Sequence, residues 1–169
     1  PIGTANDIMD AQFSPDGQSI LYRTSESLYY IAQINSTTEP ISLGRYIGTG
    51  GFNNNGTKVV FSNFDPLKAY ESFPFILEFS ADRTSRTLTA GSDYVIDPTY
   101  SQLDDTIYFA IKSKDLEGTQ GMFKIASVNP EGKINDVYSA DGYSLELPKP
   151  SGLNIYIAIE KYSPEALLD

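Results

Sequence analysis

The fold is decided by the stretch Phe13-Ser-Pro-Asp-Gly-Gln-Ser-Ile-Leu-Tyr22. It reads as the end of one strand, a tight Ser-Pro-Asp-Gly turn and the start of a second strand. Glycine at position 17 accepts the positive φ that such turns require. Ile20 and Tyr22 are two residues apart, so their side chains lie on one side of the second strand. The stretch therefore predicts an antiparallel hairpin.

Weaker copies of this hairpin recur along the chain. If Phe13 is the reference, the turn glycine follows after four residues and two apolar residues follow after seven and nine. The same offsets hold from Phe52, Tyr100 and Pro148. In the three later copies they select Gly56, Val59 and Phe61, then Asp104, Ile107 and Phe109, then Gly152, Ile155 and Ile157. We expect φ > 0 at each turn residue, including Asp104, because aspartate tolerates this conformation.

The four reference positions are separated by 39, 48 and 48 residues. A period of this length is typical of the four-stranded blades of a β-propeller. Third strands are predicted at 28–34, 73–79 and 121–128, and fourth strands at 40–43, 85–88 and 133–137. The fold class is thus all-β, with three full antiparallel blades and a partial fourth, and a β-sandwich is the alternative. The expected units are 7–43, 44–89, 90–140 and 141–162, followed by a tail at 163–169 that forms a short helix or a linker.

At residues 13–22 the chain resembles the TolB-like, WD-type β-propeller repeat family, whose repeat places Ser-Pro-Asp-Gly between an aromatic residue and an Ile-x-aromatic pair. The match is close only there. The second unit has Asn53-Asn54-Asn55 in place of Ser-Pro-Asp, the third lacks the glycine, and the fourth keeps Ser151-Gly152. The resemblance implies a periplasmic or secreted protein. Such repeats are also similar to the propeller lid of prolyl-oligopeptidase-type enzymes, whose hydrolase domain is not in this sequence.

A propeller closes with four to eight blades, and this chain supplies fewer than four complete ones. Three arrangements remain open. The segment 1–9 could add a strand to the last blade of a small ring, a second copy could complete a larger propeller as a homodimer, or the chain could be an arc of a longer protein with further blades. The start at Pro1, without Met, favours a processed protein or a fragment.

The composition excludes several kinds of chemistry. The chain is acidic, with 12 basic and 22 acidic side chains and a formal charge of -10. Without clustered Lys and Arg it is a poor candidate for binding nucleic acid or anionic membranes. It contains no Cys and no His, so disulfides, thiolate metal sites and Ser-His-Asp triads are excluded. No apolar run is long enough to span a membrane as a helix.

Candidate site residues come from the inner strands and the longer loops. In a propeller the inner strands line a central channel, and Asp10 and Asp97 begin two of them. They could bind Ca²⁺ through carboxylate oxygens or orient a sugar or a peptide amine, and the alternative is that each caps its own strand end. In the loop at 64–73, Tyr70 and Phe73 could stack on a sugar or bind a peptide, or pack beneath the loop.

The glycine-rich segment Gly48-Thr-Gly-Gly51 precedes a strand, whereas a phosphate-binding loop needs a helix behind it. A bulge or a close approach of the backbone is therefore expected there.

These observations favour a non-catalytic binding or assembly module of a larger exported protein, which recognises a protein or a carbohydrate. The alternative is the propeller part of an enzyme, either a calcium-assisted lyase or lactonase or the lid of a peptidase. The sequence nominates no catalytic residue and, apart from the possible Ca²⁺, no cofactor.

Overall fold

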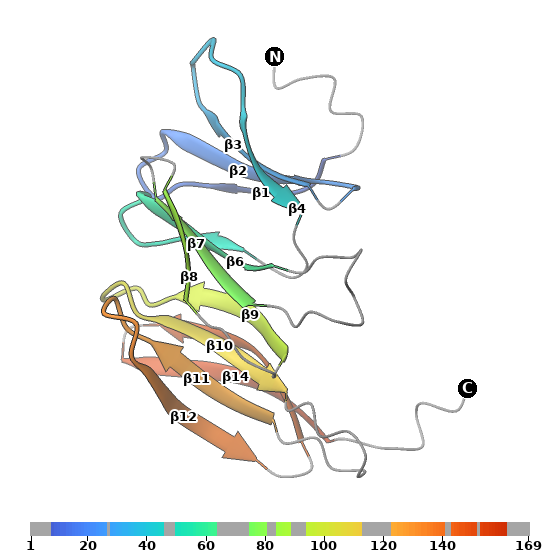
Figure 1. The fold of residues 1–169 in the computed structure, drawn as a ribbon, viewed down its shortest axis with the longest axis vertical. Helices are drawn as coiled ribbons and strands as arrows, with labels where there is room; N and C mark the ends of the chain where they lie inside the picture. The colour runs from blue at the N-terminus through green and yellow to red at the C-terminus, as the bar shows by residue number, and fades with distance from the viewer. Residues whose placement is uncertain are drawn as a thin grey trace, which may run out of the picture.

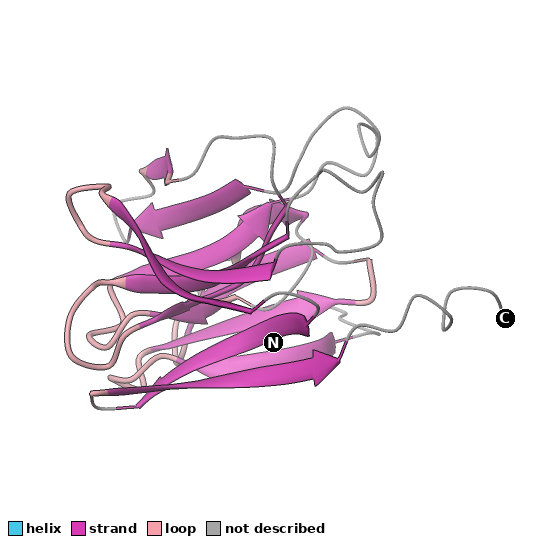
Figure 2. Cartoon of the chain, turned by 90° about the horizontal axis from the view of Figure 1, so that it is seen from below, coloured by secondary structure: helices cyan, strands magenta, loops and turns pink. Residues whose placement is uncertain are grey.

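The computed structural model describes residues 8–26, 28–45, 50–63, 75–80, 84–88, 94–112, 123–140, 143–151 and 153–161. All regular structure in these ranges is β-strand, as Figure 2 shows. The strands form consecutive antiparallel sheets that follow one another along the molecule (Figure 1). Each four-stranded sheet uses four strands in chain order, which is the arrangement of propeller blades and does not fit the alternative β-sandwich.

The first sheet contains β1 (Ile8–Phe13), β2 (Ser19–Thr24), β3 (Leu28–Gln33) and β4 (Ile41–Arg45). The second contains β5 (Gly51–Phe52), β6 (Lys58–Asn63), β7 (Phe75–Ser80) and β8 (Ser85–Thr87). The third contains β9 (Tyr94–Tyr100), β10 (Ile107–Lys112), β11 (Phe123–Val128) and β12 (Ile134–Ala140). The fourth has two strands, β13 (Tyr143–Ser151) and β14 (Asn154–Lys161). Three predicted third strands and three predicted fourth strands are therefore confirmed within a few residues.

The core lies between successive sheets, and β6 shows how it is built. Val59 and Phe61 point toward the first sheet, where they join a cluster with Leu21 and Tyr29. Val60, which points to the opposite face, belongs to a second cluster with residues of the third sheet. A strand that is buried on both faces has a continuous apolar run in place of alternation, as in Val59-Val60-Phe61. The second sheet is therefore enclosed by its two neighbours.

The third sheet is enclosed in the same way. Ile107 and Phe109 of β10 face the second sheet. Ala110 and Ile125 are cross-strand partners on the other face and are fully buried. That face is covered by β13, which packs against β9, β10 and β11.

The first turn of each four-stranded sheet, which joins its first two strands, has the same pattern of hydrogen bonds. Ser14, Asn53 and Ser101 each follow a reference aromatic residue, and each is buried. In each, the backbone N–H donates to the carbonyl oxygen five residues later, at 2.7 to 2.9 Å. The repeat predicted from sequence is therefore a repeat of turn geometry as well.

The expected positive φ is confirmed at Gly17 and Gly56 and is wrong at Asp104, because the described non-glycine residues with positive φ are Asn35 and Asp97. Asp104 instead accepts a hydrogen bond from the Thr106 N–H at 3.0 Å, which closes the third turn without that conformation.

The close backbone approach predicted for the glycine-rich segment is confirmed at Gly50. A Cβ atom at this position would overlap the ring of Phe61, which is 1% exposed. Glycine here lets the inner strand of the second sheet lie directly against this ring.

The predicted C-terminal helix or linker at 163–169 lies outside the described residues, as do residues 1–7. Ile8 and Met9 belong to β1 of the first sheet. The described part of the chain contains no helix long and apolar enough to cross a bilayer.

Candidate functional site

Asp10 and Asp97, the two carboxylates predicted for a shared channel, lie on different sheets. Asp10 is exposed on β1, the inner strand of the first sheet, and Asp97 is partly buried on β9, the inner strand of the third. The hollow that Asp10 lines does not include Asp97. Among the described residues no group of three or more Asp or Glu side chains could hold a metal ion. The use of both aspartates in binding stays a prediction.

Asp97 occupies a β-bulge. Thr99 pairs with Tyr108 and Ile96 with Ala110, so Asp97 and Pro98 together lie opposite a single residue. Asp97 has a φ of 51°, which aspartate adopts more readily than most residues. Pro98 is fully buried, and proline is tolerated on an edge strand at a bulge. A local structural reason therefore exists for an aspartate at this position.

Tyr70 and Phe73, the aromatic candidates of the loop at 64–73, lie outside the described residues. Their role in ligand binding also stays a prediction.

A small hollow lies where the first sheet meets the second. Its polar lining consists of Asp10 and Gln12 of β1 and Arg23 of β2, with Tyr29 of β3 and Gly50 beside them. These side chains converge because of strand register: Asp10 is the cross-strand partner of Arg23, and Arg23 is that of Tyr29. Cross-strand partners project from the same face of a sheet, here the face that also carries Leu21 of the core.

The electrostatics of this hollow combine both signs of charge. Burial raises the pKa of Tyr29; the positive charge of Arg23 opposes this shift and the carboxylate of Asp10 adds to it. The guanidinium carbon of Arg23 lies 6.0 Å from the centroid of the Tyr29 ring, a geometry that permits a cation–π interaction. The Nε atom of Arg23 is buried and has no hydrogen-bond partner among the described atoms.

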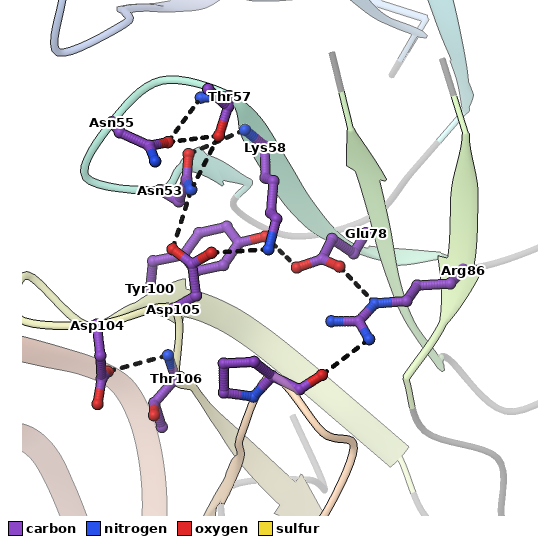
Figure 3. A network of polar contacts seen from close by, with 11 residues as sticks. Asn53, Asn55, Thr57, Lys58, Glu78, Arg86, Tyr100, Asp104, Asp105 and Thr106 are labelled. Atoms are coloured by element: carbon purple, nitrogen blue, oxygen red, sulfur yellow. Dashed lines mark hydrogen bonds and ion pairs between the residues drawn. The ribbon is translucent and has the colours of Figure 1, made fainter. Parts of the chain in front are cut away.

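A second polar cluster ties the second sheet to the third (Figure 3). The buried carboxylate of Glu78, on β7, accepts hydrogen bonds from the Tyr100 hydroxyl at 2.7 Å and from Arg86 Nε at 2.5 Å. Arg86 also donates to the carbonyl oxygen of Pro130, in the turn between β11 and β12, at 3.0 Å. The pKa of Tyr100 is raised, first by burial and then by the hydrogen bond to Glu78.

A parallel connection joins the turns of the same two sheets. Asp105 accepts a hydrogen bond from Asn53 Nδ2 at 3.0 Å and forms an ion pair with Lys58 at 2.7 Å. Burial acts to raise the pKa of Asp105, but the bonds from Lys58 and Asn53 outweigh it, so the net shift is downward. These groups are engaged in holding neighbouring sheets together, which gives them a structural role.

Sequence reasoning missed Glu78, Asp105 and Arg23. A signal existed for Asp105, because the third turn has Asp104-Asp105 where the first has Gly17-Gln18, and the second aspartate had no turn function to perform. Arg23 could be found only from register, which places it opposite Asp10.

No family model and no curated protein matches the chain. Solved structures do match. The tricorn protease is 10% identical with a TM-score of 0.58, over 72% of this chain and 13% of that one. TolB from Acinetobacter baumannii is 17% identical with a TM-score of 0.54, over 95% and 42%. An oligogalacturonate lyase in complex with manganese is 18% identical with a TM-score of 0.64, over 95% and 52%.

At these identities the likeness concerns the fold alone, and the chain spans about half or less of the length of each of these proteins. The sheet order, the enclosed middle sheets and the structural neighbours all indicate the same fold. The chain is an all-β, propeller-like array of blades, and this fold is what it shares with the matching structures.

Proposed function

We propose that this chain is a non-catalytic binding module, part of a larger propeller-containing exported protein, that recognises a protein or a carbohydrate. The observation that supports the proposal is that the ionisable groups between the second and third sheets are engaged in structural contacts. Glu78, Arg86, Lys58 and Asp105 bond to one another or to neighbouring sheets, which makes the blades a rigid support for loops. Loops on rigid supports are common recognition elements.

The periplasmic or secreted location belongs to the same proposal and rests on the resemblance at residues 13–22. The proposed partners follow from the incomplete array. Among the described residues the fourth sheet has two strands, and all six residues of β1 are exposed. Further blades or a second copy would pack against the fourth sheet or against β1. Sedimentation would detect a second copy as twice the chain mass, whereas a monomer would leave further blades or a small ring closed by the segment 1–9.

The binding role is tested with a glycan array and a pull-down from periplasmic extract. Loss of a reproducible ligand in Tyr70→Ala or Phe73→Ala supports the proposed aromatic contact. Tyr156→Ala is the matched control, because Tyr156 is 62% exposed on β14 and lies far along the chain from this loop. If the wild type finds no ligand in either assay while folding normally, the binding role is wrong.

The alternative function, the propeller part of a calcium-assisted lyase or lactonase, is favoured by one observation: Asp10 lines a hollow beside Arg23 and Gln12. Two of the structural neighbours are also named as enzymes. Calorimetry with Ca²⁺ on the wild type and on Asp10→Asn separates the two functions. Binding at millimolar Ca²⁺ that disappears in the variant would favour the enzyme, and no binding would leave this alternative without a site.

A further inference from the structure

Arg23 differs from the three cations that form ion pairs among the described residues. Lys58, Arg86 and Lys124 each have a carboxylate partner within 3.2 Å. Arg23 is opposite Asp10 in the register of β1 and β2, yet no ion pair joins them among the described contacts. Its guanidinium is instead held beside the Tyr29 ring. Arg23 is therefore placed beside an aromatic ring and forms no described ion pair with the carboxylate opposite it in the sheet.

The Nε–H group of Arg23 is withdrawn from solvent and has no acceptor in the part of the chain that the structure describes. A buried donor that makes no hydrogen bond destabilises the folded state, so native proteins seldom keep one without a reason. The hollow that Arg23 lines admits a water-sized group. Planar carboxylates match the two parallel N–H groups of a guanidinium. The acceptor in this hollow is either an ordered water or one oxygen of a carboxylate from outside the described chain, and only the carboxylate can also pair with the guanidinium charge.

Asp10 restricts which carboxylates fit. Its side chain is exposed on the same sheet face and lines the same hollow. A bare anion at Arg23 is repelled by Asp10, whereas a ligand with a hydroxyl or ammonium group next to its carboxylate can donate to it. The overall charge of -10 also disfavours long polyanions. The geometry therefore favours a small ligand, or a terminal group of a larger one, that carries a carboxylate next to a hydroxyl or ammonium group.

We propose that the hollow between the first and second sheets binds the carboxylate of an α-hydroxy or α-amino acid group, with Arg23 holding the carboxylate and Asp10 accepting from the neighbouring hydroxyl or ammonium. Gln12, whose amide lies near Gly51, supplies a further hydrogen-bonding group at the edge. The inference deepens the proposed binding role by naming a ligand class. It does not depend on the loop at 64–73, so the two proposals fail separately.

The test follows side-chain ¹⁵N–¹H resonances of arginine by NMR. Glycolate, glycine and acetate are titrated separately, with sodium chloride at matched ionic strength. Glycolate or glycine should shift the Arg23 Nε–H signal saturably, and acetate should bind more weakly. The Arg86 Nε–H signal is an internal control, because it already donates to Glu78. A response to glycolate but not to glycine assigns a hydroxy acid, and the reverse assigns an amino acid.

Two variants test the roles of the charged groups. Arg23→Lys keeps the charge but loses the paired donors, and it should weaken binding about tenfold or more. Asp10→Asn should strengthen acetate binding and remove the preference for glycolate or glycine. Lys133→Gln, a change of charge at an exposed turn of the third sheet, should leave binding unchanged. The site is refuted if no probe shifts the Arg23 Nε–H resonance at concentrations that leave the rest of the spectrum unchanged. It is also refuted if the Arg86 and Arg23 resonances shift equally.

Discussion

Replacing Tyr100 by Phe removes one oxygen atom from the buried contact between the second and third sheets. The ring remains, so the apolar cluster around Val60 and Phe109 keeps its packing. The lost hydroxyl donated to Glu78 Oε1 at 2.7 Å. Because Glu78 is 3% exposed, water does not readily replace that donor.

The expected cost follows from the charge on the acceptor. A hydrogen bond to a charged group contributes about 1.5–3 kcal/mol to the free energy of unfolding. Arg86 still neutralises the carboxylate, so the loss should stay within that range. For a chain of this size it corresponds to a fall of about 3–12 °C in Tm.

Urea unfolding followed by circular dichroism measures the change, with Tyr156→Phe as the matched control. Tyr156 is 62% exposed, and its hydroxyl should contribute nothing measurable. The double variant with Glu78→Gln should show coupling, because both changes disrupt one bond. The reasoning is refuted if Tyr100→Phe is as stable as the wild type, or if it is no less stable than Tyr156→Phe.

Three further predictions concern pH and packing. Because the pKa of Tyr100 is raised in the folded state, unfolding releases a proton above pH about 10, the unfolded tyrosine value. In urea titrations at alkaline pH, the free energy of unfolding of the wild type should fall as pH rises from there, and that of Tyr100→Phe should fall less steeply. The pKa of Asp105 is lowered in the folded state, so its contribution to the free energy of unfolding is complete above about pH 3.9 and is lost as pH falls through the folded value. The stability of Asp105→Asn should therefore fall less steeply with acid than that of the wild type, and equal slopes of stability against pH would argue against the ion pair with Lys58. In thermal melts, Gly50→Ala should destabilise the fold by about 1–3 kcal/mol, because the added carbon overlaps the Phe61 ring. Gly17→Ala places no atom within 4 Å of the added carbon and should destabilise it by only about 1–2 kcal/mol, because of the φ of 68°.

The blade repeat could be predicted because it depends on local chemistry. Turn residues such as Gly17 and Gly56 and the paired apolar residues after them are set by backbone conformation and strand period. These signals are visible at fixed offsets in the sequence. The third turn was harder, since Asp104 closes it through a hydrogen bond to Thr106 and not through the positive φ that its alignment with glycine predicted.

The site was less accessible to sequence reasoning because it depends on register between strands. Asp10 was predicted from its place in an inner strand, but its partner in the hollow, Arg23, is set by how β1 pairs with β2. Likewise, Glu78 meets Tyr100 only because two sheets pack together. Contacts between sheets leave no periodic trace in a single sequence.

The central claim is that the second sheet is enclosed between the first and third, as a blade is between its neighbours. Nuclear Overhauser effects from the methyl groups of Val59 and Val60 test it most directly. The account predicts contacts from Val59 to Leu21 or Tyr29 of the first sheet and from Val60 to Tyr100 or Phe109 of the third. Contacts from both valines to the same neighbouring sheet, or from neither to any other sheet, would contradict it.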